Sequence, residues 1–204
     1  MSKIISTKGV VVGVTPYLSD LRISLITPGM GKLYAIAKHA NSSGSKRKRF
    51  LVPGVEISAK LYIKNHYYLS NIEFLHNFVG NLESYFQAQV LKIIFSALDS
   101  FYTIDDSVKY LEIIELLKEF KSTRKFYSYA AGLKILELLG LVDLKTGTKC
   151  RVCNISMQQG YFCKGGFFCG KHLPSDSSRS FKYNIKTDKG KLQLLSDILD
   201  YWQI

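Results

Sequence analysis

Hydrophobic and polar positions alternate along much of the first 75 residues, which is the pattern of half-buried β-strands. The alternation is clearest in residues 21–26 and 55–63. Segments 7–14, 32–38 and 67–74 are rich in β-branched or aromatic residues and are also predicted strands. Five short strands without a long helix predict a small antiparallel barrel of the oligonucleotide-binding (OB) kind, although an SH3-like barrel or a split sheet would leave a similar pattern.

Past residue 80 the apolar period changes to about 3.6, which predicts helices. The first is expected from a cap at Asn81 to Phe101, and the second from residues 105–106 to Phe120. A third helix is expected over residues 130–139, with a left-handed cap at Gly140. A last amphipathic helix is predicted to pack on this bundle through Leu192, Leu195, Leu199 and Trp202.

Composition adds a strong positive charge. The 204 residues carry 28 Lys or Arg against 16 Asp or Glu, a formal net charge of +12. Residues 1–79 hold +8 of this excess and residues 150–204 hold +4, whereas residues 80–149 are neutral. An anionic partner bound mainly by the N-terminal region is therefore expected, with nucleic acid as the first candidate. A membrane surface competes, but the N-terminal third has no basic amphipathic helix to support it.

A flexible segment, HANSSGSKRKRF at residues 39–50, connects the third and fourth predicted strands. It carries four consecutive cations, Lys46, Arg47, Lys48 and Arg49, called here the basic run. Such a run is often only a solvated loop, but loops that border an OB barrel contact the nucleic acid backbone. We therefore predict that the DNA-binding residues are Arg22, Lys32, Lys38, Lys46, Arg47, Lys48 and Arg49.

Tyrosines near the predicted strands could stack on bases. Five are available: Tyr17, Tyr34, Tyr62, Tyr67 and Tyr68. A secondary basic cluster at the junction of the second and third predicted helices could extend the phosphate contacts, although such clusters are more often ordinary exposed faces. Its members are Lys118, Lys121, Arg124 and Lys125.

All four cysteines and one histidine fall between residues 150 and 172. Cys150 and Cys153 form one pair with two residues between them, and Cys169 and His172 form another. Two such pairs separated by 15 residues are the layout of a tetrahedral zinc site, and thiolate and imidazole suit zinc better than calcium or magnesium. We predict one structural Zn²⁺ per chain, because four protein ligands leave no open position for catalysis.

Cys163 is a fifth candidate ligand and stands outside both pairs. It could replace His172 to give an all-thiolate site, but Cys163 and Cys169 would then have to ligate from a longer loop. The paired spacing favours Cys150, Cys153, Cys169 and His172. Simple buried thiols and a catalytic Cys–His pair are the other interpretations, and nothing nearby in the sequence resembles an orienting partner for catalysis.

These patterns predict an α+β protein: an OB-fold barrel domain over residues 1–79 and an α-helical domain over residues 80–204, with a zinc-finger insertion at about 147–175. No secretory signal and no apolar run of membrane-spanning length is found in the sequence. A cytoplasmic protein with reduced thiols is therefore expected.

Three stretches follow the motif order of a known family. The first is KGVVVGVTPYLSDLRISLITPGMGKLYAIAKHA, with a Gly-Val-Val strand, a Pro-Tyr turn, Asp20, an alternating strand ending in Thr-Pro, then Gly-Lys and Ala-Lys. The others are LKILELLGLVDLKTGTKCRVC and GGFFCGKH. Along nearly its whole length the chain resembles the bacterial DNA repair and recombination mediator family RecO.

The resemblance implies an N-terminal OB barrel, a helical C-terminal domain and a structural zinc finger. It implies a nucleoid-associated protein that binds single- and double-stranded DNA and anneals complementary strands. Together with RecR and the C-terminal tail of single-strand-binding protein, such a mediator helps to load RecA on gapped DNA. No catalysis, membrane or small-molecule substrate is implied.

The chain departs from the family pattern at two places. Where members commonly continue Lys-Gly-Ala-Arg-Arg, this chain has KHANS at residues 38–42, so phosphate contacts could have moved to the basic run. The fourth metal ligand is usually cysteine, whereas here it would be His172.

Other functional classes remain as alternatives. An RNA-binding or ribosome-associated module would also use a basic barrel and a zinc knuckle, and a scaffold could use the same cations to bind an acidic partner tail. A magnesium-dependent nuclease would need clustered carboxylates, and the N-terminal region offers only Asp20, Glu56 and Glu73.

Overall fold

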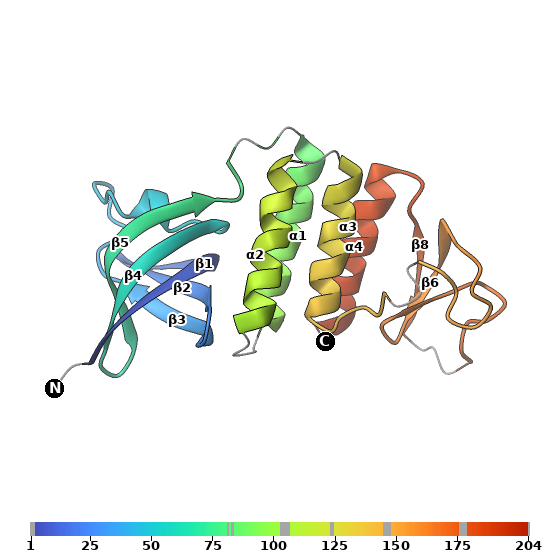
Figure 1. Cartoon of the computed structure of the whole chain (residues 1–204), viewed down its shortest axis with the longest axis horizontal. Helices are drawn as coiled ribbons and strands as arrows, with labels where there is room; N and C mark the ends of the chain where they lie inside the picture. Colours follow the sequence, from blue (N-terminus) through green and yellow to red (C-terminus); the bar gives the residue numbers. More distant parts are fainter. Residues whose placement is uncertain are drawn as a thin grey trace. The chain divides into compact units, whose positions relative to one another are not determined.

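The computed structural model describes residues 3–80, 82, 84–102, 107–122, 125–144, 148–175 and 179–203, without the side chains of residues 121–122 and 125–127. Two compact units divide the chain. Unit 1 comprises Met1–Leu82 and Phe95–Lys121, and unit 2 comprises Glu83–Ile94 and Ser122–Ile204. The order of the elements along the chain can be followed in Figure 1. The predicted division into two domains at residue 79 stays a prediction.

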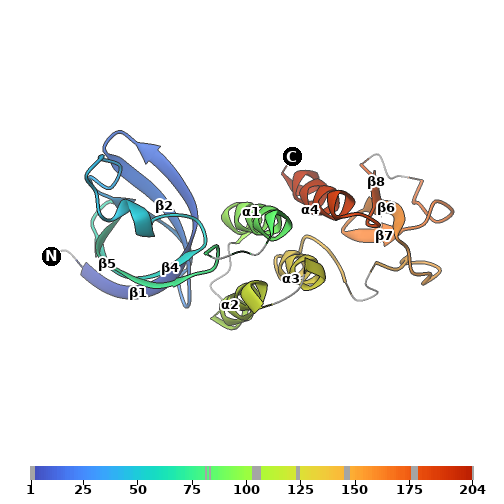
Figure 2. The same cartoon turned by 90° about the horizontal axis from the view of Figure 1, so that it is seen from above.

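Five strands form the barrel of unit 1: β1 (Lys3–Tyr17), β2 (Asp20–Thr27), β3 (Gly31–Ala37), β4 (Val55–Ile63) and β5 (Tyr67–Asn77). They close in the order β1-β2-β3-β5-β4, with β4 pairing back to β1 (Figure 2). All neighbours are antiparallel except β3 and β5, which pair in parallel at Ala35–Tyr67 and Ile36–Tyr68. This closed five-stranded topology confirms the predicted OB barrel.

The barrel interior follows from the alternation in the sequence. Leu21, Ile23 and Leu25 of β2 lie in one buried core cluster with Ile57 and Leu61 of β4, so the residues between them face outward. β1 is longer than predicted because its first part pairs with β4 and its second part pairs with β2. A register shift between Val11 and Gly13 marks the bend between the two parts, and this bulge interrupts the alternation in the sequence.

Two helices follow the barrel, α1 (Tyr85–Phe101) and α2 (Ser107–Ser122), and α1 contributes to both units. The Ser84 hydroxyl accepts a hydrogen bond from the Gln87 amide at 3.3 Å, so Ser84 caps α1. The cap predicted at Asn81 and the start predicted at Asp105 and Asp106 lie outside the described residues.

Unit 2 contains α3 (Lys125–Leu138), α4 (Asp188–Trp202) and a three-stranded sheet of β6 (Gln159–Cys163), β7 (Gly166–Phe168) and β8 (Phe181–Asn184). The predicted left-handed cap at Gly140 is confirmed by its φ of 77° and by the bond from the Leu141 amide to the Leu136 carbonyl. α4 buries Leu195 and Leu199 as predicted, together with Leu194 and Ile198. The small sheet was not predicted from the sequence.

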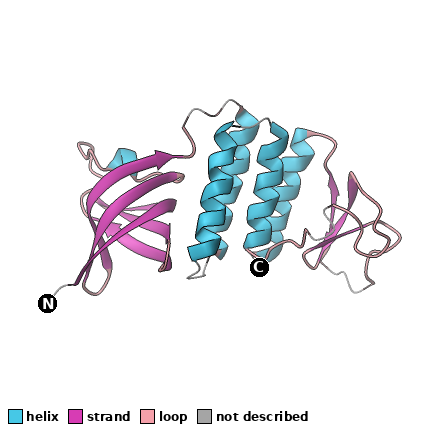
Figure 3. Cartoon of the chain, viewed as in Figure 1, coloured by secondary structure: helices cyan, strands magenta, loops and turns pink. Residues whose placement is uncertain are grey.

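Helices and strands occupy separate stretches of the chain, which is the predicted α+β class (Figure 3). Within the described part of the chain, no helix combines the length and apolar character that crossing a membrane requires.

Candidate nucleic-acid interface and metal centre

The outer surface of the barrel carries three pairs of a cation and a tyrosine. The Arg22 guanidinium lies 4.2 Å from the centre of the Tyr17 ring, and the Lys32 and Lys38 ammonium groups lie 5.3 and 5.8 Å from the rings of Tyr34 and Tyr68. These six residues are called here the cation–tyrosine face. Each pair holds a positive charge beside a flat ring, which is what a strand with phosphates and unstacked bases requires.

Two adjoining hollows lie on this face. One, of about 360 Å³, is lined by Arg22, Tyr34, Ala35, Ile36 and His66. The other, of about 520 Å³, is lined by Met30, Lys32, Leu33, Tyr34, Ile63, Lys64, Asn65, His66 and Tyr67. Tyr34 and His66 line both, so the two hollows adjoin at these side chains, and together they are called here the groove.

The groove exists because of how the barrel closes. β5 pairs with β3 at Ala35 and Ile36, so the first half of β3 has no β5 partner and faces the β4–β5 turn instead. That turn carries Lys64, Asn65 and His66. OB barrels bind oligonucleotides on the face of strands 2 and 3 between the loops after strands 1 and 4, and the groove occupies this place.

Lys64, Asn65 and His66 are not among the DNA-binding residues predicted from the sequence. Their place in the groove depends on the parallel pairing of β3 and β5, which no local pattern reveals. Once the OB topology is assumed, however, the loop between strands 4 and 5 becomes a predicted contact, so a signal was available.

An acidic residue sits at one end of the cation–tyrosine face. The Asp20 carboxylate accepts hydrogen bonds from the Lys38 ammonium at 2.8 Å and from the His39 amide at 2.9 Å. The bond from Lys38, followed by that from His39, lowers the pKa of Asp20 below its usual 3.8. The same carboxylate raises the pKa of Lys38 above its usual 10.5. Lys38 is therefore a cation whose charge is partly neutralised.

The loop that carries the basic run is fixed at its base. Asn41 donates from its amide to the Ser19 carbonyl and from its side chain to the Leu18 carbonyl, each at 2.9 Å, and so joins the loop to the β1–β2 turn. Lys48 in turn donates to the Asn41 side chain at 3.0 Å. All four cations of the basic run are exposed, and the run ends in a short 3-10 helix, η1 (Lys48–Phe50).

Of the other residues predicted to bind DNA, some line the larger hollow and others lie elsewhere. Lys32 lines the larger hollow but also donates to the Asp99 carbonyl at the end of α1. Tyr67 lines the same hollow, whereas Tyr62 pairs with Tyr68 across β4 and β5. In the secondary cluster, Lys118 forms an ion pair with Glu115 at 2.7 Å, and the side chains of Lys121, Arg124 and Lys125 lie outside the described part of the chain. The DNA contacts of all these residues stay predictions.

The four preferred metal ligands come together in unit 2. The ligand atoms of Cys150, Cys153, Cys169 and His172 all lie within 4.8 Å of one another. The Cys169 sulfur is 3.2 Å and the Cys150 sulfur 3.7 Å from the His172 Nδ1, and the Cys153 and Cys169 sulfurs are 3.9 Å apart. A tetrahedral zinc with Zn–S bonds of about 2.3 Å separates its sulfurs by about 3.8 Å, so the donor set fits this ion.

Two tight turns hold these ligands. The Asn154 amide bonds the Cys150 carbonyl at 2.9 Å with Asn154 in the left-handed region, and the His172 amide bonds the Cys169 carbonyl at 3.0 Å. Gly165 and Gly166 precede the second turn in the sequence but do not shape it. They instead belong to the β6–β7 hairpin, where Lys164 and Gly165 have positive φ values as a two-residue turn of this twist requires.

The electrostatics of the cluster also favour a cation. Burial alone would raise the pKa of Cys150, but the backbone amides of Cys153, Cys169 and Val152 outweigh it and lower this pKa to about 6. The Ile155 amide favours the thiolate of Cys153, yet burial and the neighbouring Cys150 and Cys169 raise its pKa overall. Neighbouring thiolates repel one another, and a positive ion bound between them would stabilise their charged forms.

Cys163 takes no part in this cluster. It ends β6, is 1 % exposed and pairs with Gly166 across the hairpin. The grouping therefore follows the paired spacing and not the alternative in which Cys163 replaces His172.

The two ligand-bearing turns and the sheet of β6, β7 and β8 are called here the metal module. Aromatic residues connect this module to the end of α4. Phe162 of β6 lies 5.6 Å from Tyr201 between ring centres, and the Tyr201 hydroxyl accepts a bond from the Lys164 amide at 3.0 Å. The Trp202 indole donates to the Leu141 carbonyl at 2.8 Å. The chain contains one tryptophan, so this residue can report on the module.

Comparison with known proteins adds a family to this geometry. Residues 1–78 match the family model described as recombination protein O N terminal. No curated protein matches the chain significantly. The matched residues coincide with the closed OB barrel that bears the groove. Residues 1–78 of the chain are therefore similar to the N-terminal domain of the RecO family.

Proposed function

We propose that the protein is a non-catalytic recombination mediator that binds single- and double-stranded DNA through the barrel. In this proposal it anneals complementary strands and acts in the cytoplasm at the nucleoid. It helps to load RecA on gapped DNA together with RecR and the C-terminal tail of single-strand-binding protein. The family match supports the general role, and the details rest on the barrel surface.

The cation–tyrosine face is the observation that carries the proposal. Phosphates would be bound by Arg22, by Lys38 and by the adjoining basic run, while bases would stack on Tyr34 in the groove. Both kinds of interaction are independent of base identity, so the strand would be held without reading its sequence. An exposed base is needed for stacking, so single strands or frayed ends should bind more tightly than intact duplex.

The zinc site would have a structural role. With four protein ligands it has no open position, and its module packs on α4 through Phe162 and Tyr201. Bound zinc would hold the two knuckle turns together and thereby keep β6, β7 and β8 on α4. Loss of zinc should consequently unfold this module before it affects the barrel groove.

Strand annealing by the purified protein tests the proposed function. Two complementary oligonucleotides are mixed with and without protein, and with single-strand-binding protein, across a salt titration. Faster annealing at low salt that declines steeply as salt rises is the expected result. A structured RNA competitor separates the main alternative: if it displaces the DNA strand far better than unlabelled DNA does, the protein is an RNA-binding module instead.

A further inference from the structure

The residues that line the barrel groove do not include the cations of the C-terminal region. Residues 150–204 carry eight Lys or Arg against four Asp or Glu. Among the described residues, Arg151 forms an ion pair with Asp143 at 2.6 Å and Lys191 forms one with Asp188 at 3.5 Å. Within the described part of the chain, Lys182, Lys186 and Lys189 form no ion pair, and all three are exposed.

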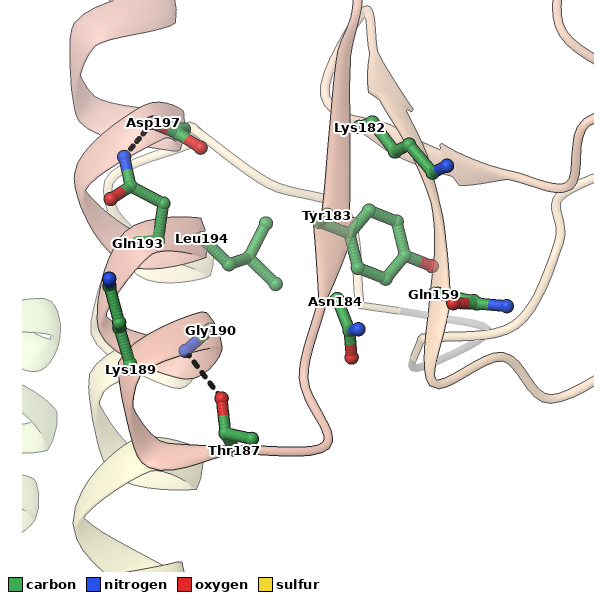
Figure 4. A pocket seen from close by; sticks show the side chains of 10 residues that line it. All are labelled: Gln159, Lys182, Tyr183, Asn184, Thr187, Lys189, Gly190, Gln193, Leu194 and Asp197. Carbon is green, nitrogen blue, oxygen red and sulfur yellow. Dashed lines mark hydrogen bonds between the residues drawn. The ribbon is translucent and has the colours of Figure 1, made fainter.

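Two of these lysines line a hollow of unit 2 between the small sheet and α4. The hollow is about 450 Å³ in volume, and its lining residues come from β6, β8, the turn after β8 and α4. In Figure 4 Lys182 projects from β8 and Lys189 from the first turn of α4. The two cations therefore belong to different elements that meet at one cavity.

The rest of the lining is mainly neutral and able to hydrogen-bond. It offers the side-chain amides of Gln159, Asn184 and Gln193 and the apolar surface of Leu194. The single lining carboxylate, Asp197, accepts a bond from Gln193 at 2.7 Å, and burial raises its pKa. The two lysines of the hollow thus outnumber its one carboxylate. Cations, amides and an apolar surface together match a nucleotide with its phosphate, base edge and base face.

Hydrogen bonds hold the turn between β8 and α4 at the edge of the hollow. The Thr187 hydroxyl accepts a bond from the Gly190 amide at 3.1 Å, and the Asn184 side chain accepts one from the Lys186 amide at 3.0 Å. A Cβ placed on Gly190 would lie 1.7 Å from the Asn184 carbonyl oxygen, so α4 begins in direct contact with the end of β8. Lys182 and Lys189 are therefore carried by two elements that touch each other.

We propose that this hollow, with Lys182 and Lys189 as its phosphate-binding groups, is a second single-strand-binding site in unit 2 that acts independently of the barrel groove. A chain with two such sites would hold two strands at once. Strand annealing would then require only one protein molecule for each pair of strands. The inference rests on the proposed nucleic-acid function but can succeed or fail separately from the barrel site.

The number of strands bound per chain, measured on the whole 204-residue chain, tests this inference. A single strand of about eight nucleotides spans no more than one OB barrel, so strands bound per chain report the number of sites. Sedimentation with labelled strand should show two strands on the wild type, one on Lys182→Ala/Lys189→Ala and one on Arg22→Ala/Tyr34→Ala. Lys92→Ala/Lys134→Ala removes the same charge from helices of unit 2 outside the hollow and should still bind two.

The outcomes separate the two sites. If Lys182→Ala/Lys189→Ala still binds two strands, the second site is overturned. If only the barrel variant keeps two strands, the barrel site fails and the second site stands. A wild type that binds one strand, with annealing unchanged in Lys182→Ala/Lys189→Ala, also overturns the inference. The inference is also overturned if inorganic phosphate binds in the hollow and a single strand binds there no more tightly than phosphate does.

The salt dependence supplies an independent measure. For a single strand, every phosphate that the protein neutralises adds about 0.7 to the slope of log K against log salt, so a strand held by the two lysines of the hollow in Arg22→Ala/Tyr34→Ala should show a slope of about 1.4. Thermal unfolding of Lys182→Ala/Lys189→Ala and of its matched control should match the wild type, because the replaced lysines are exposed.

Discussion

The Asp20 carboxylate accepts a hydrogen bond from the Lys38 ammonium at 2.8 Å at the end of the cation–tyrosine face. It also accepts one from the His39 amide, which begins the loop that carries the basic run. One acidic side chain therefore fixes the base of that loop and reduces the positive charge next to it. These two effects can be separated, because asparagine keeps the acceptor for His39 but removes the charge.

Asp20→Asn should tighten the binding of a single strand. Lys38 would then offer its full charge to a phosphate, which should raise the slope of log K against log salt by about 0.7. Fluorescence anisotropy at several salt concentrations measures this slope. Binding that weakens, with an unchanged slope, would show that Asp20 positions the loop and does not limit its charge.

The same pair sets a pH dependence of stability. Because its folded pKa lies below 3.8, Asp20 stabilises the fold fully above that pH, and this contribution is lost as the pH falls through the lowered pKa. Lys38 has a pKa above 10.5, so its contribution is complete below that pH and is lost as the pH rises through the raised pKa. Urea unfolding should show a constant difference between wild type and Asp20→Asn near neutral pH, and a smaller one at both extremes.

Replacement of the basic run tests phosphate binding by the barrel. Changing Lys46, Arg47, Lys48 and Arg49 to alanine should lower the salt slope of single-strand binding by up to about 2.8, because each of the four cations would neutralise one phosphate at about 0.7 apiece. The side chains are exposed, so stability should hold. An unchanged slope would place the DNA-binding cations outside this loop.

Tyr34 is the tyrosine best placed to stack on a base, since it is 63 % exposed and lines both hollows of the groove. Tyr34→Leu should weaken single-strand binding by about 1–3 kcal/mol, the usual contribution of one stacked base, and affect duplex binding less. Tyr85→Leu is the matched control, because Tyr85 is 78 % exposed on α1. Equal weakening in both variants would argue against a stacking role.

Zinc content tests the metal centre. Cys150→Ser should lose the ion and loosen the module, whereas Cys163→Ser should keep one zinc per chain because Cys163 lies outside the cluster. Trp202 offers a second readout, since loss of its bond to the Leu141 carbonyl should shift its emission to the red. Loss of zinc in Cys163→Ser would show that Cys163, and not one of the four, is a ligand.

Gly190→Ala tests the packing between β8 and α4. Alanine is favoured over glycine in a helix by about 1 kcal/mol, but its Cβ would meet the Asn184 carbonyl oxygen at 1.7 Å. The clash involves backbone and should prevail, so the midpoint of thermal unfolding should fall. At Gly44 an added Cβ meets nothing within 4 Å, and Gly44→Ala should leave the midpoint unchanged.

The sequence predicted the elements whose pattern is local. Alternation located the strands of the barrel, the helical period located α1 to α4, and paired spacing selected the four metal ligands. The predictions failed where distant residues decide the structure. The β4–β5 turn lines the groove only because β5 pairs with β3. The small sheet was missed because β6 pairs with β8, which follows in the sequence only after Cys169 and His172.

Local competition between residues explains the remaining differences. Gly165 and Gly166 precede Cys169 closely enough to suggest a role in the turn that holds Cys169 and His172. In the structure they belong to the hairpin between β6 and β7 instead. Likewise, a charge count treats Lys32, Lys38 and Lys46 alike. Lys32 and Lys38 have protein partners in the Asp99 carbonyl and Asp20, and this cannot be read from residue type.

The grouping of residues 95–121 with the barrel has a practical consequence for truncation. Val10, Val12 and Ile26 are at most 3 % exposed although they lie outside the core cluster of the barrel. Phe95 and Asp99 of α1 approach Gly54 and Gly13, and Tyr110 of α2 bonds Glu56. A fragment that stops at residue 79 would lack these covering side chains. Its newly bared aliphatic surface should make it prone to aggregate, so expression trials are better begun with fragments that extend through α2.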